Sequence, residues 1–154
     1  MQAALPRWKR MLLAWLYCLC CLSQAAADTP APNGKDHIVS PETIDGVINV
    51  NAEGLIEKVA RLPALVLIDS RIPADRLDGY IEGSISLPDV DTNCTSLARV
   101  VPELTTPVLF YCNGIRCGRS ASAVVIARNC GYRNLYWFRT GMEEWQEKKY
   151  PLVE

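Results

Sequence analysis

The chain has 154 residues, of which 49% are hydrophobic and 21% are charged, and its net charge is −1. A mildly acidic chain without a basic run argues against nucleic acid as a partner. No internal repeat or low-complexity segment is visible, so the composition favours one globular domain with its own core.

Residues 1–27 have the three parts of a secretory signal peptide. A short basic region (Arg7, Lys9 and Arg10) precedes an apolar stretch from Met11 to Leu22, and Ala25-Ala26-Ala27 fits a small-residue cleavage site. We therefore expect the protein to be exported, either to the periplasm or out of the cell.

Two alternatives to cleavage are open. An uncleaved membrane anchor is disfavoured because the apolar stretch of about 12 residues is shorter than the roughly 20 that a spanning helix needs. Lipid attachment at Cys18, Cys20 or Cys21 is disfavoured because none of these cysteines follows a small residue.

Removal of residues 1–27 leaves 127 residues and takes away three basic residues but no acidic one, so the net charge becomes −4. Residues 28–37 are polar and proline-containing, and we expect a flexible lead followed by one domain over residues 38–154. His37 is the only histidine and no metal-ligand spacing is present, so we expect neither a metal nor a cofactor.

Four cysteines remain in the mature chain, namely Cys94, Cys112, Cys117 and Cys130. Four cysteines allow two disulfides in three pairings, but a domain of this size does not need disulfides to be stable. We expect Cys130 to be a buried thiol at a helix end and Cys94 to be a half-exposed thiol in a loop or at a helix start.

The first half of the domain alternates between extended and helical patterns. Residues 38–44 and 47–50 have the character of short extended segments. Apolar residues at helical spacing predict a helix over 51–62, capped by Asn51 and stopped by Pro63. The continuous apolar run 65–68 is typical of a central parallel strand. A short helix or turn over 73–80 and a strand over 84–87 follow.

The second half repeats this alternation. We expect a helix over 97–101, a buried strand over 107–111, and a helix over 121–127 that Ser120 opens and Gly131 ends in a left-handed conformation. A strand over 134–138 and a helix from 141, stopped before Pro151, complete the chain. We expect Trp137 and Trp145 in the core. The alternation predicts an α/β fold with a central, mainly parallel sheet, helices on both faces and ligands at the carboxyl ends of the strands.

Cys112 lies at such a strand end, directly after the run Pro107–Tyr111 and before a loop with two glycines and two arginines. Backbone N–H groups of the loop, the start of the next helix and the guanidinium groups each favour a thiolate, which is the nucleophilic form of cysteine. The segment therefore predicts covalent cysteine chemistry on an anionic or sulfur-bearing substrate. A buried strand-end cysteine without a function is the alternative.

Three motifs in register make the chain similar to single-domain rhodanese-like sulfurtransferases over about residues 47–153. The first is Leu67-Ile-Asp69-Ser-Arg71 with the later Gly79-Tyr-Ile-Glu-Gly83. The second is the loop after Cys112, and the third is Tyr136–Trp145 followed by Tyr150-Pro151. The resemblance implies the rhodanese-like fold and transfer of a sulfane sulfur through a persulfide on Cys112.

The chain departs from the family pattern in two places. Tyr80 stands where the family usually has a histidine after the first glycine. The loop is longer than usual, with Arg116 four, Cys117 five and Arg119 seven positions after Cys112.

The resemblance and the loop chemistry together assign expected roles. Cys112 is the catalytic nucleophile, and the substrate is held by the loop residues Asn113, Gly114, Ile115, Arg116, Cys117, Gly118 and Arg119. Asp69 and Arg71 hold loops in place rather than touch the substrate. Arg116 as a solvated arginine and Arg119 as a structural arginine paired with a carboxylate are the alternatives. The expected partners are a small anionic sulfur donor such as thiosulfate, a thiol or cyanide-type acceptor and a sulfur-carrier protein, with a monomer as the expected state.

Cys117 has three possible roles. It could resolve Cys112 by forming a disulfide with it, lie exposed and unpaired, or point into the sheet. A loop wrapped around an anion turns its side chains outward, so we expect no disulfide between Cys112 and Cys117 in the resting protein.

Two other functional classes fit the same loop. One is a non-enzymatic sulfur carrier or redox module that uses Cys112 and Cys117. The other is a phosphatase or arsenate reductase, which the spacing of Arg116 and Arg119 from Cys112 disfavours.

Overall fold

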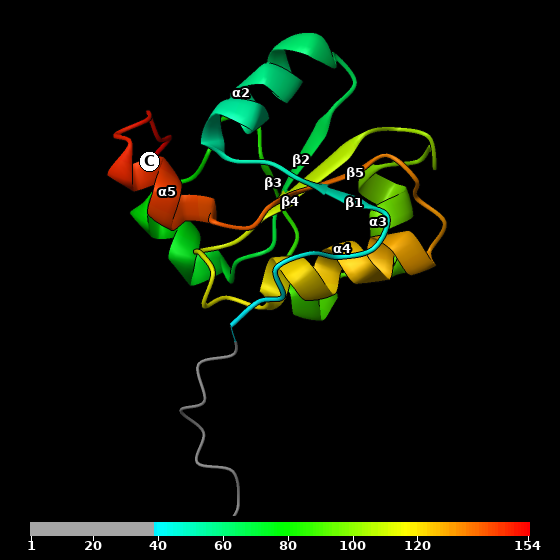
Figure 1. Ribbon diagram of the computed structural model, residues 1–154. Coiled ribbons are helices and arrows are strands. Elements are labelled where there is room, and N and C mark those ends of the chain that lie inside the picture. The colour runs from blue at the N-terminus through cyan, green and yellow to red at the C-terminus, as the bar shows by residue number, and fades with distance from the viewer. Residues whose placement is uncertain (1–38) are drawn as a thin grey trace, which may run out of the picture. The chain divides into compact units, whose positions relative to one another are not determined.

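A five-stranded parallel sheet forms the centre of the structure, a computed structural model that describes residues 39–154 (Figure 1). The signal peptide, the lead segment and His37 lie outside these described residues. Across the sheet the strands follow the order β1 (Val47–Asn49), β5 (Leu135–Phe138), β4 (Val108–Tyr111), β2 (Val66–Asp69) and β3 (Ile85–Ser86). Each neighbouring pair is parallel, and β4 is the middle strand.

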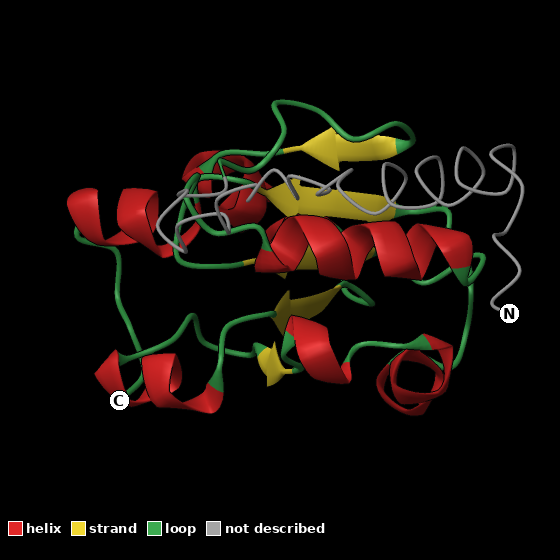
Figure 2. Ribbon diagram, turned by 90° about the horizontal axis from the view of Figure 1, so that it is seen from below, coloured by secondary structure: helices red, strands yellow, loops and turns green. Residues whose placement is uncertain are grey.

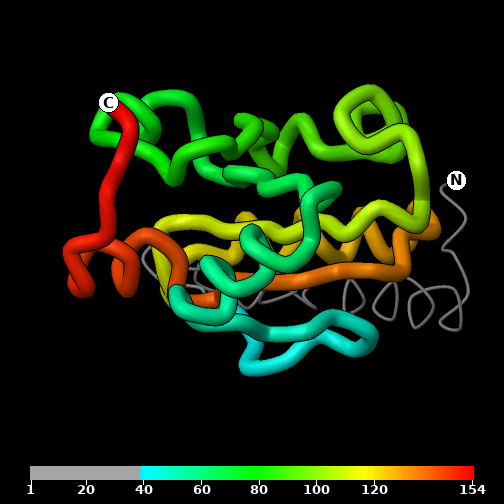
Figure 3. Tube along the Cα trace, turned by 90° about the horizontal axis from the view of Figure 1, so that it is seen from above, coloured from blue at the N-terminus to red at the C-terminus, as the bar shows by residue number. Residues whose placement is uncertain are grey.

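Helices cover both faces of this sheet. One face packs against α3 (Cys94–Val100) and α4 (Arg119–Asn129), and the other packs against α2 (Ala52–Arg61) and α5 (Gly141–Glu147). Seen from below, α4 lies in front of the strands (Figure 2), and seen from above, α2 does (Figure 3). Two short 3₁₀ helices, η1 (Pro73–Asp78) and η2 (Asp89–Asp91), flank β3. The predicted α/β fold with helices on both faces is confirmed.

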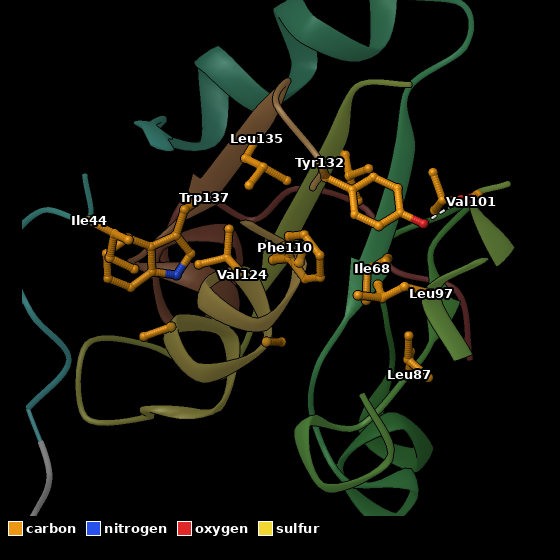
Figure 4. Close-up of a cluster of buried hydrophobic side chains, with 14 residues drawn as sticks. Ile44, Ile68, Leu87, Leu97, Val101, Phe110, Val124, Tyr132, Leu135 and Trp137 are labelled. Carbon is orange, nitrogen blue, oxygen red and sulfur yellow. Dashed lines mark hydrogen bonds between the residues drawn. The ribbon is translucent and has the colours of Figure 1, made fainter. Parts of the chain in front are cut away.

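Alternating strand residues divide the core into two halves. Ile68, Phe110 and Trp137 are fully buried toward α3 and α4 (Figure 4). Leu67 and Leu109 point to the opposite face, toward α2 and α5. Because both faces are covered, the strands are continuous apolar runs, as expected for a central parallel sheet. The core positions predicted for Trp137 and Trp145 are confirmed.

Capping residues next to the helices determine where several of them begin or end, as the sequence predicts. The Asn51 side chain accepts a hydrogen bond from the Gly54 N–H at 2.8 Å and caps α2. Gly131 follows α4 with a φ of +104°, the left-handed conformation expected after a helix. The helix predicted over 97–101 begins earlier, at Cys94, because Asn93 and Ser96 form a capping box there.

Residues 39–44 belong to no strand, although an extended segment was predicted there. Ser40 instead donates hydrogen bonds from its N–H and its hydroxyl to the Ile115 carbonyl, at 2.8 and 2.9 Å. The Arg139 side chain holds the same segment by donating to the carbonyls of Ser40 and Pro41. This segment therefore packs against the loop that follows β4.

A disulfide joins Cys94 to Cys130, with Cα atoms 5.4 Å apart. The expectation of two separate thiols is therefore wrong. Cys94 begins α3 and Cys130 caps the end of α4, and the two helices pack on the same face of the sheet, so these two ends lie together. Closing a loop of this length stabilises the fold by about 4 kcal/mol in the chain-entropy description.

Candidate active site

Cys112 follows β4 directly, at the carboxyl end of the middle strand, and is fully buried. The loop of residues 112–118 then leads into α4, as the yellow segment of Figure 1 shows. Gly118 occupies the N-cap position of α4 and no side chain caps this helix. The first N–H groups of α4 therefore have neither an intrahelical partner nor a side-chain cap.

The start of α5 holds the first two residues of the loop. The N–H groups of Met142 and Glu143 donate to the carbonyls of Cys112 and Asn113, at 2.9 and 2.7 Å. Gly141 has a φ of +50°, and a Cβ there would overlap the Cys112 carbonyl. A glycine is needed at this position because the two backbones approach so closely. The position of the Cys112 backbone is thus fixed from outside the loop.

A disulfide links Cys112 to Cys117, whose Cα atoms are 6.3 Å apart. The expectation that the resting protein lacks this bond is wrong. The loop does not hold its side chains outward, because the Cys117 N–H donates to the Gly114 carbonyl at 3.0 Å and turns the chain back toward Cys112. Cys112 is fully buried and Cys117 is half-buried.

The buried carboxylate of Asp69 gathers hydrogen-bond donors from three segments. Arg71 binds it through Nε at 2.9 Å and through its terminal nitrogen at 2.7 Å. Arg76 donates at 2.9 Å and the Tyr111 hydroxyl at 2.8 Å. The Tyr111 hydroxyl also lies 3.0 Å from the Ser84 hydroxyl. The end of β2, the end of β4, η1 and the approach to β3 therefore meet at one charge.

This network shifts the pKa of two of its members. Burial, together with the charge of Asp69, raises the pKa of Tyr111 to about 12. Burial opposes the charge of Arg71, but its hydrogen bonds and charge interaction with Asp69 outweigh burial, so the pKa of Arg71 is raised. Both shifts favour the neutral tyrosine and the charged arginine, which are the forms that donate to Asp69.

The network reaches the cysteine loop through Asp75. Arg71 donates to the Asp75 carbonyl at 3.0 Å and so fixes the start of η1. The Asp75 carboxylate then accepts hydrogen bonds from Asn113 at 2.9 Å and from Arg119 at 3.1 Å. Arg119 also lies 4.0 Å from Asp89. Arg119 therefore pairs with carboxylates, whereas Arg116 is exposed and forms no ion pair with any residue between 39 and 154.

A pocket of about 230 Å³ opens beside the loop. Its lining combines the charged residues Arg71, Asp75, Asp78 and Glu143 with the uncharged Asn113, Met142 and Gln146. The Glu143 carboxylate lies so close to Gly114 that a Cβ on Gly114 would overlap it. The side of the loop that faces this pocket is therefore acidic.

The structure brings Asn113 and Arg119 into contact with Asp75, and it joins Cys117 to Cys112. Gly114 and Ile115 contact Glu143 and Ser40, respectively. Asp75 and Glu143 are absent from the residues predicted from the sequence. Asp75 could have been suspected because it closely follows the Asp69-Ser-Arg71 motif, but nothing local in the sequence marks Glu143.

Comparison with known proteins identifies the family. A family model, described as the Rhodanese-like domain, matches residues 43–148. The chain belongs to the rhodanese-like family. Its strand-end cysteine, its loop and the Asp69–Arg71 pair all lie inside the matched range.

Solved structures support the fold of this rhodanese-like domain. A rhodanese-related protein from Thermoplasma volcanium is 27% identical, with a TM-score of 0.50 over 69% of this chain and 97% of that one. A thiosulfate sulfurtransferase from Pseudomonas aeruginosa is 22% identical, with a TM-score of 0.57 over 70% of this chain but only 20% of that one. A homodimeric polysulfide-sulfur transferase from Wolinella succinogenes is 19% identical, with a TM-score of 0.56 over 70% and 79%.

No curated protein sequence matches the chain. Within residues 39–154, no helix is both long and apolar enough to cross a membrane. The same part of the chain contains no group of three or more side chains that could hold a metal ion.

Replacement of Tyr111 by phenylalanine should lower the free energy of unfolding by about 1–2 kcal/mol near neutral pH, because Asp69 and Ser84 lose a buried partner. The folded-state pKa of about 12 lies above the value near 10 of an unfolded tyrosine. The stability that the hydroxyl contributes is therefore complete below about pH 10 and is lost as the pH rises toward 12. Urea unfolding of both proteins across this range should show the difference shrinking, and a constant difference would contradict the assignment.

Replacement of Glu143 by glutamine should lower the Kd of a small probe anion such as thiosulfate several-fold, because one negative charge beside Gly114 is worth about 1 kcal/mol against an incoming anion. Glu147→Gln removes the same charge from the same helix outside the pocket, and serves as the control. Titration of both variants with the anion at two salt concentrations measures the effect. An equal Kd in the two variants would show that Glu143 does not act on an anion at the loop.

Proposed function

We propose that this rhodanese-like domain is a sulfurtransferase in which Cys112 carries the sulfur. The Cys112 thiolate attacks the sulfane sulfur of a donor such as thiosulfate. A bond forms between Sγ and that sulfur, and sulfite leaves with the electron pair of the broken S–S bond. A thiol or cyanide-type acceptor then takes the outer sulfur from the Cys112 persulfide and restores the thiolate.

The position of Cys112 is the observation that carries this proposal. It lies at the carboxyl end of the middle strand, and α4 begins only a few residues further on without a side-chain cap. Uncapped N–H groups and the positive end of the helix stabilise a thiolate and, after transfer, the terminal sulfur of a persulfide. The family membership and the sulfurtransferases among the structural neighbours support the same chemistry.

The reduced protein is the active form in this proposal. While the Cys112 sulfur is bonded to Cys117 it is not a thiolate, so it cannot attack a donor. Catalysis therefore begins only after a reductant has opened this disulfide. Once the loop is open, Arg116 is free to reach a donor, whereas Arg119 must first leave Asp75.

The second candidate function is a sulfur-carrier or redox module without turnover on small donors. The Cys112–Cys117 disulfide favours it, because a dithiol pair passes sulfur or electrons to a partner protein without a substrate pocket. The acidic pocket favours it as well, since carboxylates repel small anions. The same carboxylates count against all small tetrahedral oxyanions, which include the substrates of a phosphatase or an arsenate reductase as well as thiosulfate.

Replacement of Cys112 by serine should abolish thiocyanate formation from thiosulfate and cyanide in the reduced protein, because serine cannot form a persulfide. Circular dichroism checks that the variant is folded. Mass spectrometry should find one added sulfur atom on wild-type Cys112 after thiosulfate treatment and none on the variant. Thiocyanate formation above a few per cent of wild type would refute the assignment. A sulfur adduct without turnover would instead support the carrier module.

We further propose that the mature, monomeric protein begins at or near Asp28 and is exported. Structural disulfides persist in oxidising compartments, and Cys94–Cys130 is such a bond. N-terminal sequencing of protein recovered from the periplasmic or secreted fraction should give Asp28. A sequence that starts at Met1 in that fraction would contradict cleavage.

A further inference from the structure

We infer that Cys117 resolves the Cys112 persulfide and that the domain thereby reduces a sulfane sulfur to hydrosulfide. This inference rests on the proposed sulfur transfer to Cys112. It adds a second catalytic cysteine, a second product and a requirement for a dithiol reductant. In this reaction the domain uses its own two thiols as the electron source.

The loop geometry gives Cys117 access to the required atom. The structure joins the Sγ of Cys117 to the Sγ of Cys112, which is the atom that carries the outer sulfur in a persulfide. A turn closed by the Cys117 N–H and the Gly114 carbonyl brings the two side chains together. The backbone of Cys112 is fixed by α5, so the loop reaches this arrangement while the nucleophile stays in place.

The resolving step balances as an internal thiol–disulfide exchange. The Cys117 sulfur attacks the inner sulfur of the persulfide, and a bond forms between the two Sγ atoms. The bond between Cys112 Sγ and the outer sulfur breaks, and hydrosulfide leaves with its electron pair and with the proton of the Cys117 thiol. The two thiols are oxidised to the disulfide and the sulfane sulfur is reduced.

Proximity favours this internal attack over attack by an acceptor from solution. Cys112 is fully buried, whereas Cys117 is half-buried and belongs to the same loop. Groups that are held next to each other react as if present at a very high concentration. The internal thiol therefore competes effectively with dilute external acceptors for the persulfide.

The greater exposure of Cys117 also determines which sulfur a reductant attacks when the disulfide is reduced to two thiols. An external dithiol reaches the half-buried Cys117 sulfur more easily than the buried Cys112 sulfur. Attack at Cys117 releases Cys112, whose thiolate is stabilised by the start of α4 and is the better leaving group. A dithiol must therefore reduce the Cys112–Cys117 disulfide before each turnover. Dithiothreitol is the simplest dithiol with which to test this step.

A single-turnover reaction tests the resolving step. The protein is reduced with dithiothreitol, freed of reductant without air, and mixed with an excess of thiosulfate. Wild type should release sulfite and hydrosulfide in equal amounts and should end as the Cys112–Cys117 disulfide in peptide maps. Cys117→Ser should still release sulfite, keep one added sulfur on Cys112, and release hydrosulfide on the order of 100-fold more slowly.

A control separates this pair from the other disulfide. The double variant Cys94→Ser and Cys130→Ser, checked for folding by circular dichroism, should release hydrosulfide as wild type does. Sulfite without hydrosulfide from wild type overturns the resolving role and leaves the proposed sulfur transfer intact. Equal hydrosulfide release from Cys117→Ser also overturns it. Absence of both products means that sulfur transfer itself fails, and the inference falls with it.

Discussion

The buried charge of Asp69 is the constraint on which the site depends. An ionised carboxylate without water is costly unless donors surround it, and removal of one partner of a buried ion pair costs about 3–5 kcal/mol. Here two arginines and a tyrosine supply those donors. Asp69 is paired with Tyr111 across the sheet, and Tyr111 directly precedes Cys112. The requirement to satisfy one charge therefore aligns the ends of two strands and positions the loop that begins there.

Much of the fold could be predicted because its signals are local. The apolar runs ending at Ile68, Tyr111 and Phe138 are long enough to identify buried strands, and the segments between them have helical spacing. The capping box at Asn93 and Ser96 is also local, and could have placed the start of α3 correctly. The segment 39–44 was harder, because its contacts with Ile115 and Arg139 come from distant parts of the chain.

The site was only partly predictable for the same reason. The position of Cys112 follows from a strand, a loop and a helix that are consecutive in the sequence. Asp75 and Glu143 lie on η1 and α5, and they meet the loop only because both elements pack at the carboxyl end of the sheet. Disulfide pairing was not predictable either, since Cα separations of 5.4 and 6.3 Å depend on helix packing and on one loop turn.

In the proposed reaction, the acidic pocket and the pairing of Cys112 with Cys117 both affect the stability of a persulfide on Cys112. That proposed persulfide carries a negative charge, and the carboxylate of Glu143 lies against the loop that must hold it. The repulsion between the two charges raises the energy of the persulfide, whereas the Cys112–Cys117 disulfide carries no charge. The start of α4 opposes this effect by stabilising the anion. In the proposed reaction the balance between these two effects sets how long the persulfide lives, and the carboxylate of Glu143 beside the loop shifts that balance toward resolution by Cys117.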